Sequence, residues 1–493
     1  MKRAVAILAL MTGGCMSMEP KYVQPDPAVP ASWPVGDPYL TQSEAALPAV
    51  TYKDIFRDPR LQTLIDQALI NNRDLMVSVA NIEAARAQFQ IQRAQQFPQV
   101  GASAGVTLTG DRGSSGSGSG TGSGSGSGGS GKSSKSVTAQ YSAGLSVPSF
   151  ELDLFGRLRS LTHAQFERYL ATEAAARATR LTLVAEIANG WLDYAADSSL
   201  LAVSQDTAAA AAKSVQLTQA RLNAGIAART DLVQAEQILD TAQADVANQR
   251  TLVAQDVNAL QLLVGAPIDP KLLSPSIDEA SPTIAELPPG LSSYVLLRRP
   301  DVVEAEYNLR AANANIGAAR AALFPKITLT GLLGFASSAL TSLFTGGAFG
   351  WSASANAAYT IFNAGAGHAN VRLSEAQREA AVATYQGTIQ SAFRDVADAL
   401  ARRGTMDEQL SARQRQDAAA AEYLRLSEAR YKAGVDNYLT TLDAQRSYYS
   451  ARQLLVQTKL TAAQNLVNLY QALGGDPLLQ TAPVQKSPLM SGQ

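Results

Sequence analysis

The chain has 493 residues and carries 41 basic and 42 acidic side chains, so its formal net charge is −1. This balance argues against a nucleic-acid-binding protein, which needs an excess of positive charge. A single cysteine excludes an intramolecular disulfide, and two histidines leave little for a zinc site or a catalytic triad. Aromatic residues make up 6% of the chain, which favours long, closely packed helices over a thick aromatic core. We therefore expect no enzymatic activity, no metal site and no cofactor.

The first residues have the pattern of a secretory signal. Two basic residues precede an apolar run, residues 4–11, which is too short to cross a bilayer as a helix. Small residues then lead to Cys15, an arrangement that resembles the bacterial lipobox, in which the cysteine is acylated and becomes the mature N-terminus. We predict a signal peptide at residues 1–14 and a lipid-anchored, proline-rich segment at residues 15–59. A plain signal peptide with an incidental cysteine is the alternative, because Thr12 stands where the lipobox usually has leucine.

The rest of the chain contains two related halves. Residues 80–100 match residues 307–327 at an offset of 227, and residues 220–225 match residues 429–434 at an offset of 209. The first half therefore carries an insertion of 18 residues between these matches. A run of 19 glycine, serine and threonine residues, 113–131, lies in that interval and is typical of an unstructured loop.

These matches divide the chain into segments. We predict a first repeat at residues 60–264 and a second at residues 292–475. A proline-rich linker, residues 265–291, joins them, and a tail, residues 476–493, follows. Because proline at this density blocks helices and central strands, we expect the proline-rich pieces to run over the outside of a helical body.

Each half contains two segments with the alternation of β-strands. After each Phe-Pro pair the apolar pattern changes from period 3.6 to period 2. Strands are predicted at residues 99–109, 137–148, 326–337 and 349–362. They carry almost no charge and have about the length of membrane-spanning β-strands. Soluble hairpins packed on helices are the alternative interpretation.

Four strands cannot close a membrane barrel, because single-chain barrels begin at about eight and open edges cannot face lipid. A barrel built from these strands must therefore be shared between chains. Two chains would supply eight strands and three would supply twelve, and the strand count does not choose between them.

Long helices fill most of the remaining sequence. Residues 157–222 and 365–431 are helical in pattern without a proline, and each run would be about 100 Å long at 1.5 Å per residue. An apolar spacing near 3.5 in the first run is typical of coiled-coil packing. We expect turns at Gly225 and Gly434, because glycine adopts the left-handed conformation that ends helices. Shorter helices are predicted at residues 60–96, 231–264, 292–323 and 440–473.

Several of these features together resemble a known family. The two repeats, the Phe-Pro pair that opens each strand hairpin and residues 431–445, YKAGVDNYLTTLDAQ, are similar to the TolC-like outer membrane efflux proteins. Cys15 and residues 21–34 and 472–475 resemble the lipoprotein branch that serves resistance-nodulation-division pumps. The resemblance implies a mixed α/β membrane protein that forms a homotrimer. A twelve-stranded outer-membrane β-barrel would be continued by an α-helical coiled-coil tunnel in the periplasm.

The resemblance also implies a gate at the periplasmic helix tips. Asp231 and Asp443 match aspartates that line the constriction, and three copies of each would form rings of carboxylates that favour cations. Leu439 matches an apolar ring beside them. Arg430 and Tyr431 match residues that tie the inner hairpin closed.

Four of the gate residues have a simpler interpretation. Asp231 could complement the start of a helix, and Arg430 could be a helix C-terminal cation. Leu439 could belong to the core, and Asp443 could lie on a solvated face.

The resemblance implies an exit duct of a tripartite efflux system, of the kind associated with multidrug resistance. Such a duct passively exports what an inner-membrane resistance-nodulation-division pump delivers through a periplasmic adaptor. The outer channel of a type I protein-secretion system is the alternative. A secreted coiled-coil lipoprotein would explain the helices and Cys15 but not the charge-free strands. The sequence does not identify the substrate, and no nucleic acid is expected as a partner.

Overall fold

A computed structural model describes residues 17–30, 32–34, 36, 39, 51–110, 137–285, 293–474 and 476–481. The predicted signal peptide, Cys15, the Gly/Ser loop at residues 113–131 and the tail after residue 481 lie outside the described residues. Two compact units form. Unit 1 comprises residues 1–22, 87–166 and 310–378, and unit 2 comprises residues 23–86, 167–309 and 379–493.

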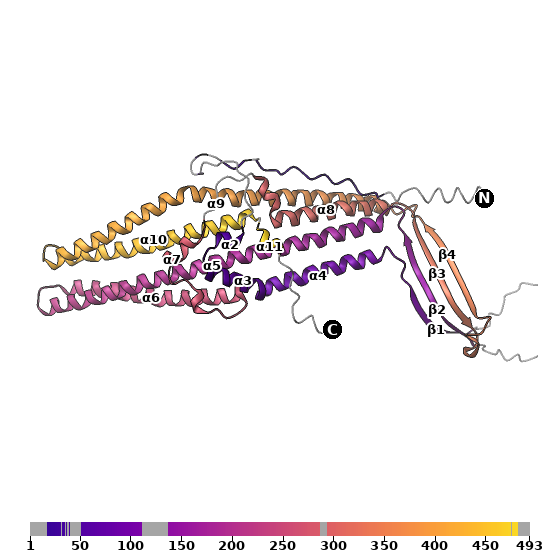
Figure 1. Cartoon of the computed structure of the whole chain (residues 1–493), viewed down its shortest axis with the longest axis horizontal. Helices are drawn as coiled ribbons and strands as arrows, with labels where there is room; N and C mark the ends of the chain where they lie inside the picture. The colour runs from indigo at the N-terminus through magenta and orange to yellow at the C-terminus, as the bar shows by residue number, and fades with distance from the viewer. Residues whose placement is uncertain are drawn as a thin grey trace, which may run out of the picture. The chain divides into compact units, whose positions relative to one another are not determined.

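Unit 1 contains a four-stranded antiparallel sheet in the order β1-β2-β3-β4 (Figure 1). The strands are β1 (Gly101–Gly110), β2 (Val137–Leu152), β3 (Lys326–Ser337) and β4 (Phe349–Ala358). The structure therefore has the four strands per chain that the alternating pattern predicts. β2 continues four residues past the predicted end and contains a bulge between Val147 and Phe150. β4 ends at Ala358, before the predicted boundary at residue 362.

The two outer strands of this sheet are open in the single chain. Within the described residues, β1 pairs only with β2 and β4 pairs only with β3. Large apolar side chains on these edges are exposed, including Leu108 at 65% and Trp351 at 73%. Exposed apolar side chains are suited to lipid, but the unpaired backbone groups of an edge strand are unstable against it. The sheet is therefore suited to pairing with further strands at both edges.

Ion pairs join the strand ends of unit 1 to its helices. Glu151 near the end of β2 accepts from Arg157, at 2.7 Å, and from Lys326 at the start of β3, at 2.9 Å. The rings of Phe155 and Phe324 stack beside them with centroids 4.7 Å apart. Phe324 belongs to the Phe-Pro pair that precedes β3, so this pair anchors the change from helix to strand.

The extended residues at the start of the described chain lie against helices. In unit 1, both carboxylate oxygens of Glu19 lie 3.1 Å from Nδ1 of His163, and the Asn313 amide donates to the Pro20 carbonyl at 2.8 Å. In unit 2, Trp33 is buried and stacks on Phe393 at 4.7 Å. These residues cover helices, as expected for a proline-rich segment.

The helices of the two halves correspond in length. The main pairs are α4 (Arg73–Ala94) with α8 (Pro300–Ala321), 22 residues each; α5 (Arg157–Asn223) with α9 (Ala366–Lys432), 67 each; and α6 (Arg229–Val264) with α10 (Tyr438–Leu473), 36 each. Equal lengths are what an internal repeat requires. The remaining helices of the described residues are α2 (Tyr52–Ile55), α3 (Pro59–Asn71), α7 (Ile277–Ala280) and α11 (Pro477–Thr481). Their 3₁₀ turns are η1 (Pro270–Leu272), η2 (Ser281–Thr283), η3 (Ser293–Arg298) and η4 (Leu340–Ser342).

The prediction of one helix over residues 60–96 is wrong, because the chain breaks at Asn72 between α3 and α4. The Asn72 side chain accepts from the Leu75 backbone at 2.9 Å and donates to the Leu263 carbonyl at 2.7 Å. Asparagine readily forms such bonds with the backbone in place of continuing a helix. The predicted helix over residues 292–323 is likewise divided, into η3 and α8.

The core of unit 2 lies where α3 and the linker residues pack on α5 and α10. Trp191 of α5 is fully buried and donates from its indole to the Leu272 carbonyl at 3.0 Å. Phe56 and Tyr470 pack edge to face with centroids 5.4 Å apart. This packing holds the bases of the helices that carry the candidate site.

Among the described helices, none contains a stretch long and apolar enough to cross a bilayer.

Candidate gate at the tips of the helix hairpins

Two helix hairpins in unit 2 end in the same kind of turn. Hairpin 1 is formed by α5 and α6, hairpin 2 by α9 and α10, and both turns lie at the same end of the unit (Figure 1). Gly225 and Gly434 each have a φ of 74°. The hydrogen bonds from Gly225 to Leu222 and from Ile226 to Arg221 form a Schellman motif, which satisfies the last carbonyls of α5.

Hairpin 2 repeats this motif and adds an ion pair to it. Gly434 and Val435 donate to the carbonyls of Tyr431 and Arg430. The Arg430 side chain also forms a bidentate pair with Asp436, at 2.6 and 2.9 Å. This hydrogen bond lowers the pKa of Asp436 and raises that of Arg430. Arg430 therefore closes the turn of its own hairpin, which is more than a helix C-terminal cation does.

The two hairpins contact each other just behind the turns. Tyr431 is buried, and its ring centroid lies 5.1 Å from that of Tyr438 on α10. From hairpin 1, the guanidinium carbon of Arg221 lies 4.4 Å from the centre of the Tyr431 ring. Ala235 and Leu442 are buried against these rings. We call these five residues the tip cluster.

Leu439 and Asp443 share an exposed face at the start of α10. They are four residues apart, so they lie one helical turn apart on one side of the helix. Leu439 is 55% exposed, and the interpretation that it belongs to the core of the chain is wrong. Asp443 is also exposed, and in the described part of the chain it forms no ion pair. The face presents a carboxylate beside an apolar side chain.

Asp231 lies in the first turn of α6, where its charge complements the helix dipole. Burial is the main cause that raises the pKa of Tyr438, and the charge of Asp231 adds to it. Asp231 is therefore close to the tip cluster. Within the described residues, no hydrogen bond or ion pair joins it to Asp443.

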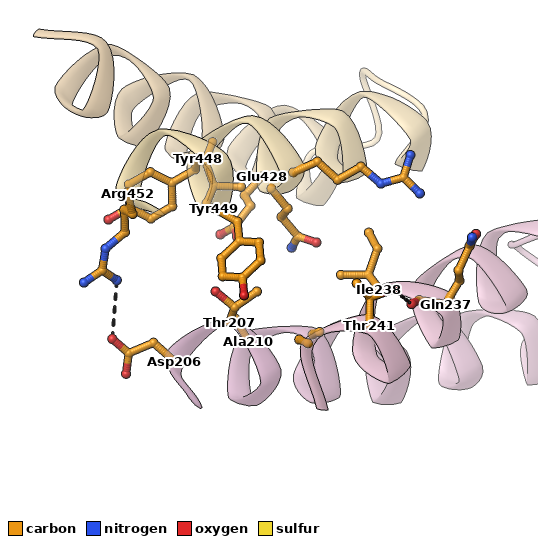
Figure 2. A pocket seen from close by; sticks show the side chains of 15 residues that line it. Asp206, Thr207, Ala210, Gln237, Ile238, Thr241, Glu428, Tyr448, Tyr449 and Arg452 are labelled. Carbon is orange, nitrogen blue, oxygen red and sulfur yellow. Dashed lines mark hydrogen bonds and ion pairs between the residues drawn. The ribbon is translucent and has the colours of Figure 1, made fainter. Parts of the chain in front are cut away.

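A cavity of about 290 Å³ separates the hairpins further from the turns (Figure 2). Small and apolar side chains line much of it, among them Ala210, Ala211, Ile238, Ala242 and Leu424. Polar contacts between the two hairpins lie beside this cavity. Arg452 of hairpin 2 pairs with Asp206 of hairpin 1 at 3.4 Å, and the Tyr449 hydroxyl lies 2.8 Å from Asp245 and 3.0 Å from Ser204.

A group of carboxyls joins the two helices of hairpin 1 nearer their bases. Asp193 and Asp197 lie one turn apart on α5, and Asp256 lies on α6. Burial and the charges of Asp197 and Asp193 raise the pKa of Asp256 to about 7. The Gln464 amide of α10 donates to Asp193 at 2.8 Å. Across the parts of the chain that the structure describes, no three histidine, cysteine or carboxylate side chains form a group that could hold a metal ion.

Sequence reasoning missed the partners of the predicted gate residues. Alignment of the repeats places Arg221 opposite Arg430, which marks Arg221 as a candidate. It does not indicate that Arg221 contacts Tyr431 of the other repeat. Asp436 and Tyr438 lie within residues 431–445, but that stretch does not indicate their contacts, and Tyr449 lies outside it.

A sheet with open edges, whose charged residues Glu151 and Lys326 lie only at strand ends, together with long hairpins that bear carboxylates at their tips, defines an outer-membrane channel. The particular family is shown by a family model for outer membrane efflux proteins, which matches residues 64–266 and 291–475. The chain belongs to this family. The predicted fold class, outer-membrane location and function as an efflux exit channel are thereby confirmed.

Individual relatives agree with this assignment. The chain is 42% identical to a probable efflux pump outer membrane protein, TtgC, of Pseudomonas putida, over 97% of this chain and 96% of the relative. It is 39% identical to the outer membrane protein OprJ of Pseudomonas aeruginosa, over 95% of each chain. The solved open state of the MtrE outer membrane channel of Neisseria gonorrhoeae superposes with a TM-score of 0.81 at 35% identity, over 93% of this chain and 98% of that chain.

Proposed function

We propose that the chain acts as a homotrimer in which three four-stranded sheets close one twelve-stranded barrel. The open edges of β1 and β4 support this proposal, since both need a partner strand. The likeness to solved channels supports it as well. The helix hairpins of three chains then continue the barrel as a periplasmic tunnel, through which substrate diffuses without chemical change.

The relatives support partners of the efflux-pump kind. The named relatives include outer membrane components of efflux pumps. This chain accordingly receives substrate from an inner-membrane resistance-nodulation-division pump, through a periplasmic adaptor that docks at the helix tips.

The hairpin tips form the gate of this duct. The observation that carries this assignment is the exposed face of Leu439 and Asp443, next to a turn that Arg430 and Asp436 close. Around a threefold axis, the three Asp443 carboxylates form a ring that attracts cations, and the three leucines form an apolar ring beside it. Asp231 adds three carboxylates nearby, and Tyr431 holds hairpin 2 against hairpin 1.

Single-channel recording in planar lipid bilayers tests the gate. The double variant Asp443→Ala with Leu439→Ala is expected to raise the conductance, because both rings lose bulk and charge. Asp407→Ala with Leu426→Ala removes an exposed aspartate and an exposed leucine from α9 and serves as the matched control. Equal conductance in the two double variants contradicts the gate assignment.

Cys15 carries the lipid anchor in this proposal. The small residues before it support acylation, with palmitate among the expected chains. Glu19, four residues after Cys15, is held against His163. Mass spectrometry of the mature N-terminal peptide is expected to find acyl chains on Cys15, and a free thiol there would refute the anchor. Cys15→Ser provides the unacylated reference.

A further inference from the structure

Contacts join hairpins 1 and 2 at several levels, and two of these levels lie nearest the turns. The first is the tip cluster. The second surrounds Tyr449, which lies eleven residues after Tyr438 on α10, about 16 Å along the helix axis. The hairpins are therefore attached at the turns and again well away from them.

The contact at Tyr449 reaches both helices of hairpin 1. Its hydroxyl donates to Asp245 of α6 at 2.8 Å and lies 3.0 Å from the hydroxyl of Ser204 on α5. Ser204 is buried, 1% exposed, so water does not compete freely for this bond. With the Tyr449 proton committed to Asp245, Ser204 is the donor to the Tyr449 oxygen. A single hydroxyl thus bridges three helices.

The space between the two levels offers little resistance to movement. The alanines that line the cavity interlock weakly, because a small side chain makes few dispersion contacts. Gln445 donates to Ser214 at 3.3 Å, a long contact between neutral groups. The tips can therefore move apart while the hairpins remain attached at Tyr449.

We propose that the Tyr449 hydroxyl is a second latch between the hairpins, which limits how far they separate once the tip cluster has opened. Tyr449 is a positioning residue in this role, since it acts through the hairpins and not on the substrate. The proposal rests on the gate proposed above and adds a second constraint in series with it.

The neighbouring residue provides a close control. Tyr448 lies beside Tyr449 on α10 and also lines the cavity (Figure 2). Its ring lies under Arg452, at 5.8 Å, and within the described residues its hydroxyl forms no hydrogen bond. Tyr449→Phe removes the latch hydroxyl and keeps the ring, whereas Tyr448→Phe makes the same chemical change without breaking the bridge.

Single-channel recording tests the limit on opening. Arg221→Ala loosens the tip cluster and provides the background for both changes. Because the tip cluster still holds the hairpins together, Tyr449→Phe alone is expected to leave the ratio of open to closed channel nearly unchanged. Combined with Arg221→Ala it is expected to raise the ratio of open to closed channel by about tenfold over Arg221→Ala alone, the effect of losing one hydrogen bond to a charged group. An equal ratio in the Tyr448→Phe and Tyr449→Phe combinations overturns the proposal.

Hydrogen–deuterium exchange of the full-length protein tests the latch independently of conductance. Peptides covering residues 240–250 and 445–455 are expected to exchange faster in Tyr449→Phe than in Tyr448→Phe. Equal exchange overturns the latch. If Arg221→Ala does not open the channel, the tip cluster does not hold the gate and the limit on its opening fails, whereas the conductance of the Asp443→Ala, Leu439→Ala variant still tests the gate. The exchange result then decides whether Tyr449 holds the hairpins together.

Discussion

The guanidinium carbon of Arg221 lies 4.4 Å from the centre of the Tyr431 ring, so the last turn of α5 holds the last turn of α9. Arg221 and Arg430 occupy matching positions in the two repeats, yet they bind differently. The residue six positions after Arg430 is Asp436, which pairs with it, whereas the residue six positions after Arg221 is Ala227. Because hairpin 1 has Ala227 where hairpin 2 has Asp436, Arg221 has no acidic partner at that position and can join the two hairpins.

Removal of this contact is expected to loosen the proposed gate. A cation over an aromatic ring contributes about 1 kcal/mol, so Arg221→Ala should shift the balance between closed and open channel about fivefold towards open. Current through single channels in planar bilayers measures this shift.

Arg425→Ala is the control for Arg221→Ala, because Arg425 is exposed and pairs with Glu422 on its own helix. Arg221→Lys should retain part of the closure, since lysine keeps the charge but not the planar group. If Arg221→Ala leaks no more than Arg425→Ala, the tip cluster does not hold the gate.

Stability is expected to fall as the pH rises towards neutrality. Burial, with the charges of Asp197 and Asp193, raises the pKa of Asp256 from 3.8 to about 7. Between these two values the folded chain keeps a proton that the unfolded chain has lost, so its free energy of unfolding decreases with rising pH and levels off above about 7. The loss should be about 2 kcal/mol, below the full linkage value because the site is partly solvated.

Denaturant unfolding at pH 5 and pH 8 measures this loss. Asp256→Asn should flatten the difference, because its amide can donate to Asp197 at every pH. Asp206→Asn, at an exposed carboxylate, should leave the difference as it is. A pH dependence that persists unchanged in Asp256→Asn would contradict the assignment to this carboxyl.

A comparison of two glycines distinguishes the stability cost of backbone strain from that of steric overlap. Gly225 and Gly265 have nearly the same positive φ, 74° and 71°. A Cβ at Gly225 would meet open space, whereas a Cβ at Gly265 would lie 2.5 Å from the Asn71 carbonyl oxygen.

Gly225→Ala should therefore cost about 1 kcal/mol, the strain of the left-handed conformation alone. Gly265→Ala should cost about 3 kcal/mol, because the C-terminus of α6 must also move away from α3. Thermal unfolding followed by circular dichroism compares the two. Equal losses of stability in the two variants would show that the end of α6 moves away from α3 at no cost in free energy.

Local patterns in the sequence were sufficient for most of the secondary structure. The helix predicted over residues 157–222 ends one residue later, at Asn223, because apolar periodicity and the Gly225 stop signal are both local. The alternation that predicts β3 at residues 326–337 coincides with the strand that forms. The break at Asn72 was missed, since it depends on a bond to Leu263, which lies 191 residues away in the chain.

The sequence by itself determined the repeat, the two long helices, the existence of the four strands and the family, because these follow from spacings of a few residues or from similarity along the whole chain. Only the tertiary structure decided which gate residues have partners in the chain: Arg430 with Asp436, Tyr431 with Arg221, and Asp443 with none among the described residues. It also revealed the bridge of Tyr449 to Ser204 and Asp245. Such contacts depend on how two hairpins pack side by side, and packing joins residues whose separation in sequence carries no signal.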